Sequence, residues 1–163
     1  MRSLAFFAPL AAALAVAAPA LAEPAAVTVT LGPDLQDRVE TLGRRDVTEQ
    51  TDRLAQIVAR TLAKRGALDG ARIDLILTDL KPNRPTFQQL VDRPGLDGIR
   101  SISIGGATIE GQITTADGAV RPVRYDWYSS SIDNVRGFNT WQDADRAYRR
   151  LAVNLADGRY VRR

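Results

Sequence analysis

Apolar and polar residues alternate over residues 26–31, so that three apolar side chains share one face and two threonines share the other. This spacing predicts a half-buried β-strand. Residues 71–80 alternate in the same way, with Ile73, Leu75 and Leu77 on one face. Ile76 adds an apolar residue to the opposite face, and we therefore expect this strand to be central and partly covered on both sides.

Apolar residues three and four positions apart predict two helices between these strands. The first is short, covers residues 35–42 and ends at Gly43. The second is long. Asp46 and Glu49 have the spacing of a capping box at its start, and Gly66 is placed as a left-handed terminator at its end.

A last helix is expected to begin at Thr140, with Asp143 as its capping carboxylate, and to end at Gly158. Asp145 and Arg149 are four residues apart, which predicts an ion pair on the surface of this helix. The apolar stripe of the helix should face the core, and we expect both tryptophans of the chain, Trp127 and Trp141, to be core residues.

Residues 99–129 predict a β-hairpin. The apolar residues change from even to odd positions at residues 105–106, so we expect a β-bulge at this pair of glycines. A three-residue turn ending at Gly118 pairs residues whose numbers sum to 234, which places Glu110 opposite Arg124. Pro122 lacks a backbone donor, and we therefore expect the second strand of the hairpin at an edge of the sheet.

These elements, in chain order, predict an α+β fold. We expect a two-layer sandwich in which a four-stranded mixed sheet, with its bulged hairpin, carries two long helices on one face. A helix joins the first two strands, so they can be parallel through a right-handed crossover. The other face would be polar and partly open, with Thr28, Thr30, Asp74, Thr78, Glu110, Arg124 and Asp126.

Composition narrows the chemistry that the chain can perform. The chain has 163 residues, of which 45% are apolar and 25% charged, and this indicates globular structure. It contains neither cysteine nor histidine. Thiol chemistry, disulfides, metal sites built from Cys or His, and mechanisms that use an imidazole are therefore excluded.

Residues 1–22 have the three parts of a secretory signal peptide: Arg2, an apolar run, and the small–x–small sequence of residues 20–22. We expect cleavage after Ala22, which leaves residues 23–163 as a single domain in the periplasm. A membrane anchor is the alternative. The run is rich in alanine, contains two prolines and passes directly into a charged stretch, so we expect no membrane span after cleavage.

Charge gives little indication of a partner, since the chain without residues 1–22 has 21 basic and 19 acidic residues. Arginines nevertheless gather near the end of the sequence, at positions 149, 150, 159, 162 and 163. They would suit an anionic ligand or a nucleic acid, or they form a solvated helix face with a basic tail. We expect the second arrangement, and no nucleic-acid partner.

No segment has the pattern of a catalytic or cofactor site. Residues 104–111 superficially suggest a phosphate loop, but their glycine spacing is wrong and they lie in a predicted strand. Asp74 and Asp79 are five apart in one strand, hence on opposite faces. We assign no catalytic residue, no metal and no cofactor, although a carboxylate pair from different strands is left open.

Residues 81–97 form a long connection in which residues 86–91 suit one turn of helix, and loops of this length are often functional.

Glu110 and Arg124 could form a charged site on the open sheet face. An ordinary surface pair worth about 0.2–1 kcal/mol is the simpler interpretation. The candidate binding residues are polar side chains of the loop of residues 81–97 and of the open sheet face: Asn83, Arg84, Thr86, Gln88, Glu110, Arg124 and Asp126.

Three runs of the sequence, KPNRPTFQQL at residues 81–90, PGLD at residues 94–97 and IGGA at residues 104–107, resemble uncharacterised exported proteins of alphaproteobacteria. The resemblance extends over most of the chain after residue 22. It implies export and draws attention to the loop of residues 81–97, and it implies no activity.

We therefore expect a non-enzymatic module that binds another protein or a component of the cell envelope. The alternative is a carboxylate-dependent hydrolase acting on glycan or peptidoglycan, which would need two converging Asp or Glu side chains, one with a strongly raised pKa. A ligand carrier is a third possibility, and it would need an apolar cavity between the sheet and the helices.

Overall fold

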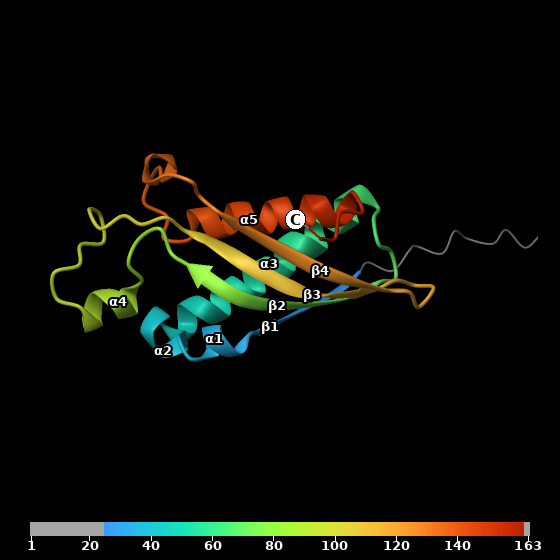
Figure 1. Cartoon of the computed structure of the whole chain (residues 1–163), viewed down its shortest axis with the longest axis horizontal. Helices are drawn as coiled ribbons and strands as arrows, with labels where there is room; N and C mark the ends of the chain where they lie inside the picture. The colour runs from blue at the N-terminus through green and yellow to red at the C-terminus, as the bar shows by residue number, and fades with distance from the viewer. Residues whose placement is uncertain (1–24, 162–163) are drawn as a thin grey trace, which may run out of the picture.

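The computed structural model describes residues 25–161. Its centre is a four-stranded sheet with the order β1-β2-β3-β4, formed by Ala26–Leu31, Arg72–Lys81, Gly106–Thr114 and Val120–Tyr128 (Figure 1). β1 and β2 are parallel, and the other two pairings are antiparallel. The predicted mixed sheet of an α+β protein is thus confirmed. The predicted signal peptide and the last two arginines lie outside the described residues.

Two long helices, α3 (Arg44–Arg65) and α5 (Gln142–Ala156), pack against each other and against the sheet. α3 contacts β1, whereas α5 contacts β3 and β4. Shorter helical turns fill the connections: α1 (Pro33–Gln36), α2 (Val39–Leu42), α4 (Phe87–Asp92) and the 3₁₀ turn η1 (Ile132–Asn134). Among residues 25–161, no helix has the length and apolar character needed to cross a bilayer.

The core lies between the helices and one face of the sheet, because alternate strand residues point toward α3 and α5. Ile73, Leu77, Ile109 and Ile113 are fully buried on this face. Leu54, Val58, Leu62, Tyr148 and Leu151 meet them from the two helices. The opposite face carries exposed residues, among them Ile76, Glu110 and Arg124, so the sheet is open on that side.

The hairpin of β3 and β4 has the predicted register. Glu110 lies opposite Arg124, and the Thr115 N–H donates to the Ala119 carbonyl across the turn (2.9 Å). β4 is an edge strand, as Pro122 indicates. The Arg124 N–H, two residues further along the same edge, donates outward to the Tyr160 carbonyl (3.0 Å).

The predicted bulge at residues 105–106 is wrong. β3 begins at Gly106, so the apolar residues before it lie outside the strand and need not share its alternation. The pairing of β3 with β4 is continuous, and the register shift of the sheet is between Leu77 and Asp79 of β2. β3 does require a glycine further along, at Gly111. With φ at 148°, its Cα passes so close to the backbone of Asp74 that a Cβ would collide with it.

Both predicted helix caps are also wrong. α3 begins at Arg44, two residues before Asp46, and the Asp46 carboxylate instead accepts a hydrogen bond from the Trp141 indole N–H (3.2 Å). α5 is capped by Trp141 without a side-chain bond, and not by Thr140. Gly66 does end α3 in the left-handed conformation (φ 57°). Asp46 thus makes a tertiary contact and does not cap α3.

Two smaller predictions need correction. The short helix expected over residues 35–42 is divided into α1 and α2 at residues 37–38. Asp145 does not pair with Arg149. It is buried against α3, where Arg53 Nη2 donates to its Oδ2 (2.6 Å). Trp141 is buried as expected, and Trp127 is half-buried against the core.

Candidate functional site

Two connecting segments meet at one end of the molecule. Residues 82–105, which include α4, leave β2 and lead into β3, and residues 129–141 lead from β4 into α5 (Figure 1). Backbone hydrogen bonds join them: the Asn83 N–H donates to the Thr140 carbonyl (2.7 Å), and the Ser129 N–H donates to the Gly105 carbonyl (3.1 Å). The two segments are therefore bonded to each other near both of their ends.

Asn83 is the centre of this junction and is fully buried. Its Oδ1 accepts the Asp143 N–H (2.8 Å), while its Nδ2 donates to the Asp143 carboxylate (2.6 Å) and to the Ser103 carbonyl (3.2 Å). The side chain thus supplies the cap that α5 lacks locally. Gly105 lies directly against it, where a Cβ would be within 2.7 Å of the Asn83 Oδ1.

Arg84 joins the two segments a second time. It is only 5% exposed, and its guanidinium donates to the carbonyl of Ile99 and to that of Gly137 (2.7 and 3.2 Å). The guanidinium carbon also lies 5.2 Å from the centre of the Phe138 ring. One buried cation therefore holds residue 99 and residue 138 next to each other.

Local hydrogen bonds stiffen the rest of residues 82–105. Thr86 and Gln89 form a reciprocal capping box that starts α4. The Asp97 carboxylate accepts the N–H groups of Arg100 (2.9 Å) and Ile99 (2.7 Å), and these bonds hold the pKa of Asp97 below its ordinary value. Although it has little regular secondary structure, this connection is held in place at several points.

The surface that these bonds support is strongly apolar. Eleven large apolar side chains are exposed among the described residues, and eight of them lie in these two segments. Phe87 is 78% exposed and Phe138 75%. We call this surface the apolar end and define it by Phe87, Val91, Leu96, Ile99, Ile102, Ile104, Ile132 and Phe138. Exposed apolar patches of this kind mark contact sites.

The open sheet face carries a hollow of about 540 Å³. Glu110 and Arg124 are opposite each other there, but among the described residues no ion pair within 4 Å joins them. Asp74 accepts from the Thr28 hydroxyl (2.7 Å) and pairs with Arg72 (2.9 Å), and these contacts hold its pKa below the ordinary value. Thr28, Arg72 and Asp74 thus bond to one another on this face.

A half-buried polar cluster surrounds Asp79 at the end of β2. Its carboxylate accepts the Tyr128 hydroxyl (2.7 Å) and pairs with Arg38 (2.6 Å). Burial alone would raise the pKa of Asp79, but these hydrogen bonds outweigh it and the pKa is lowered. Burial raises the pKa of Tyr128, and the bond to Asp79 adds to the effect. An ionised acid and a protonated phenol stabilise each other, and neither is poised for proton transfer at neutral pH.

The same direction holds for the other carboxyl groups with a perturbed pKa. Asp74, Asp79, Asp97 and Asp117 all have it lowered, and a general acid needs a raised one. Among residues 25–161, no group of three acidic side chains suits a metal ion. None of these four carboxyl groups therefore has the raised pKa that the general acid of a hydrolase needs.

The structure does not bring the predicted binding residues into one site. Asn83, Arg84 and Thr86 are buried and support the connection from inside, and Gln88 bonds to Asp92 within α4 (2.9 Å). The three other candidates, Glu110, Arg124 and Asp126, are exposed on the strands of the open face. The exposed apolar residues beside Asn83, Arg84 and Thr86 were not among the predicted binding residues. Their signal was present: Phe87, Val91 and Ile99 are large apolar residues in a long connection that is rich in Pro and Gly.

No protein-family model matches the chain, and no curated protein matches it either. The resemblance to exported alphaproteobacterial proteins thus stays a prediction.

Proposed function

We propose that this protein is an exported, non-enzymatic binding module that contacts a partner protein in the cell envelope through the apolar end. The observation that carries the proposal is the combination of exposed Phe87, Ile99 and Phe138 with a backbone fixed by buried Arg84 and Asn83. A soluble domain gains no folding free energy from apolar side chains left in water, whereas a binding surface uses them.

The rigidity of the apolar end favours binding. Covering one large apolar side chain contributes about 1.5–3 kcal/mol. Part of such a gain is normally lost because loops must be ordered when a complex forms. Here Arg84 already holds the carbonyls of residues 99 and 137, and Asn83 holds residues 103 and 143. Most of the ordering is therefore complete in the free protein.

The charges around the apolar end favour a protein over an anionic lipid surface. Three exposed arginines, Arg93, Arg100 and Arg136, are balanced by three exposed aspartates, Asp92, Asp97 and Asp133. A segment that binds anionic membranes carries an excess of cations, each contributing about 1 kcal/mol. A balanced polar rim around an apolar centre is typical of protein–protein interfaces.

Export is the second part of the proposal, and the support is the three-part pattern of residues 1–22. Sequencing the amino terminus of the protein recovered from cells tests it. We expect Glu23 as the first residue, in the periplasmic fraction. An intact residue 1, with the protein in the membrane or the cytoplasm, would refute it.

The contact itself is tested by comparing two variants in which exposed apolar residues become serine. Phe87→Ser with Phe138→Ser alters the apolar end, and Ile76→Ser with Val120→Ser is the matched control elsewhere on the surface. After crosslinking in intact cells, we expect one adduct that the first variant loses and the control keeps. Equal adducts from both variants, or turnover of an envelope polymer by the purified protein with no adduct at all, would contradict the proposal.

A further inference from the structure

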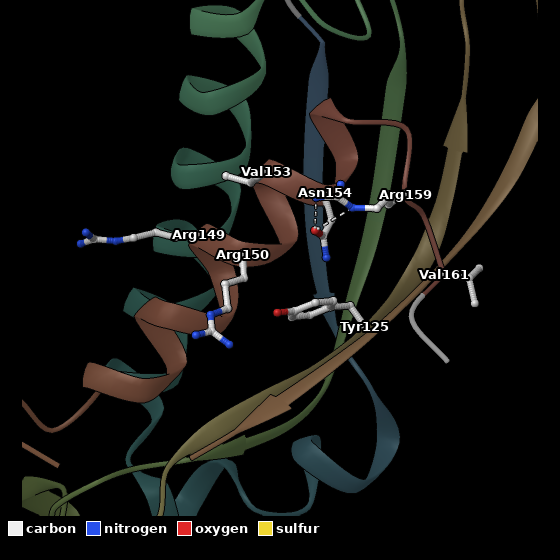
Figure 2. A pocket seen from close by; sticks show the side chains of 7 residues that line it. All are labelled: Tyr125, Arg149, Arg150, Val153, Asn154, Arg159 and Val161. Atoms are coloured by element: carbon white, nitrogen blue, oxygen red, sulfur yellow. Dashed lines mark hydrogen bonds between the residues drawn. The ribbon is translucent and has the colours of Figure 1, made fainter. Parts of the chain in front are cut away.

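A separate pocket of about 650 Å³ lies between α5 and β4, on the side of the sheet that carries the helices (Figure 2). This volume is in the range of small-molecule sites. The residues that line it come from β4, from two turns of α5 and from the segment after α5: Tyr125, Arg149, Arg150, Val153, Asn154, Arg159 and Val161.

The fold holds these residues in place for independent reasons. Arg150 and Asn154 are four apart on α5 and therefore share a face of the helix. Tyr125 is one of the odd-numbered residues of β4, which point toward the helices. The chain after α5 returns along the edge of β4, where the Arg124 N–H donates to the Tyr160 carbonyl (3.0 Å), and this brings Arg159 and Val161 to the pocket.

The pocket combines an aromatic wall with two positioned cations. The Tyr125 ring, which is 4% exposed, closes the pocket on the side of β4, and its hydroxyl points toward the side where Arg150 lies (Figure 2). The Arg150 guanidinium carbon is 4.5 Å from the centre of the Trp127 ring, which orients it without neutralising its charge. Arg159 Nη2 donates to Asn154 Oδ1 (2.9 Å) and to Asp157 (2.8 Å). Arg149 extends away from Tyr125.

Positive charge exceeds negative charge around this pocket. Among residues 25–161, no carboxylate lies within 4 Å of Arg149 or Arg150. In the part of the chain that the structure describes, Asp157 is the one acidic residue that pairs with an arginine of the pocket, Arg159. Its carboxylate is shared, because it also pairs with Arg65 (2.7 Å). Guanidinium groups that are held in place suit a carboxylate, sulfonate or phosphate group.

We propose that this pocket binds a small amphipathic anion, with its acidic group on Arg150 and its apolar part beside the Tyr125 ring. A neutral apolar ligand would leave the cation of Arg150 uncompensated. The site is independent of the apolar end, and it gives the arginine cluster a role that its sequence pattern did not favour.

Two fluorescent probes that differ by one charge test this site. The anionic probe is 8-anilinonaphthalene-1-sulfonate, and the neutral one is N-phenyl-1-naphthylamine. We expect the protein to bind the sulfonate at least about tenfold more tightly than the amine, because a charge-assisted hydrogen bond is lost with the neutral probe. Arg150→Gln should abolish this preference, and Arg60→Gln, on the exposed surface of α3, should keep it.

The location is read from nuclear magnetic resonance. The sulfonate should shift the Trp127 indole N–H, next to Arg150, and leave that of Trp141, which is bonded to Asp46, unchanged. Equal affinity for the two probes, or an unchanged preference in Arg150→Gln, would overturn the proposal. Loss of all binding in Phe87→Ser would do the same, because it would place the probe on the apolar end.

Discussion

Asn83→Ala tests how the apolar end is held. The substitution removes three hydrogen bonds, two to Asp143 and one to the Ser103 carbonyl. It leaves the buried N–H of Asp143 and part of its buried carboxylate without these partners, and also the carbonyl of the exposed residue Ser103, in a place where Asn83 is 0% exposed. A buried group left unsatisfied costs about 1–3 kcal/mol. Asp143 keeps its contact with Arg146 (3.2 Å), which limits the total.

We therefore expect Asn83→Ala to lower the free energy of unfolding by about 3–4 kcal/mol, a large part of the ~5–15 kcal/mol typical of a domain. Equilibrium urea titration followed by circular dichroism measures it. Asn134→Ala is the control, since this exposed side chain makes no hydrogen bond among the described residues, and a change within about 0.5 kcal/mol is expected. A loss below about 1 kcal/mol in Asn83→Ala would refute the role given to this residue.

Two further predictions concern the sheet. Tyr128→Phe removes a hydrogen bond that lowers the pKa of Asp79 and should destabilise the protein by about 1–2 kcal/mol at pH 7. A depressed carboxyl pKa stabilises the fold above about pH 4, and this contribution is lost as pH falls through the pKa of the folded state. The difference in unfolding free energy between Tyr128→Phe and the unsubstituted protein should therefore shrink in acid. A difference that stays constant with pH would contradict this role of Tyr128. Gly111→Ala drives a Cβ into the backbone of Asp74 and should lower the free energy of unfolding by about 2–3 kcal/mol. Gly98→Ala is the control, because its Cβ would meet only Leu90 at 3.5 Å, and it should change the urea midpoint little. Equal effects of the two substitutions would be evidence against the close approach at Gly111.

The period-two pattern of the strands predicted most of the sheet, because burial on one face determines which residues alternate. The register of β3 with β4 followed from one turn glycine and from the need to keep Ile109 and Tyr125 on the same face. The position of β4 at the edge of the sheet followed from Pro122, since a missing donor is harmless where no strand pairs with that residue from outside.

The helix starts could not be predicted in the same way. The pattern at Asp46 is a good local cap, but Trp141, 95 residues later, provides a better partner for its carboxylate. The cap of α5 comes from Asn83, 60 residues earlier in the chain. Such contacts depend on tertiary structure, and a local window contains no signal for them.

The candidate surfaces were only partly visible in the sequence. The length of the connection between β2 and β3 pointed to a contact region, but its polar residues were favoured, and Asn83 and Arg84 turn inward to hold it. The pocket beside α5 was not predicted, because Tyr125 comes from a strand, Arg150 from a helix and Arg159 from the segment after it. Only folding brings them together.

The most direct test of binding through the apolar end is site-specific photocrosslinking in intact cells. A photoreactive amino acid replaces Phe87 or Phe138 at the apolar end, or Val120 at the hairpin turn as a control of similar exposure. We expect one envelope protein attached to positions 87 and 138, absent from position 120, and lost from both when Ile99→Asp is added. The same adduct from all three positions, or none from positions 87 and 138, would contradict binding through this surface.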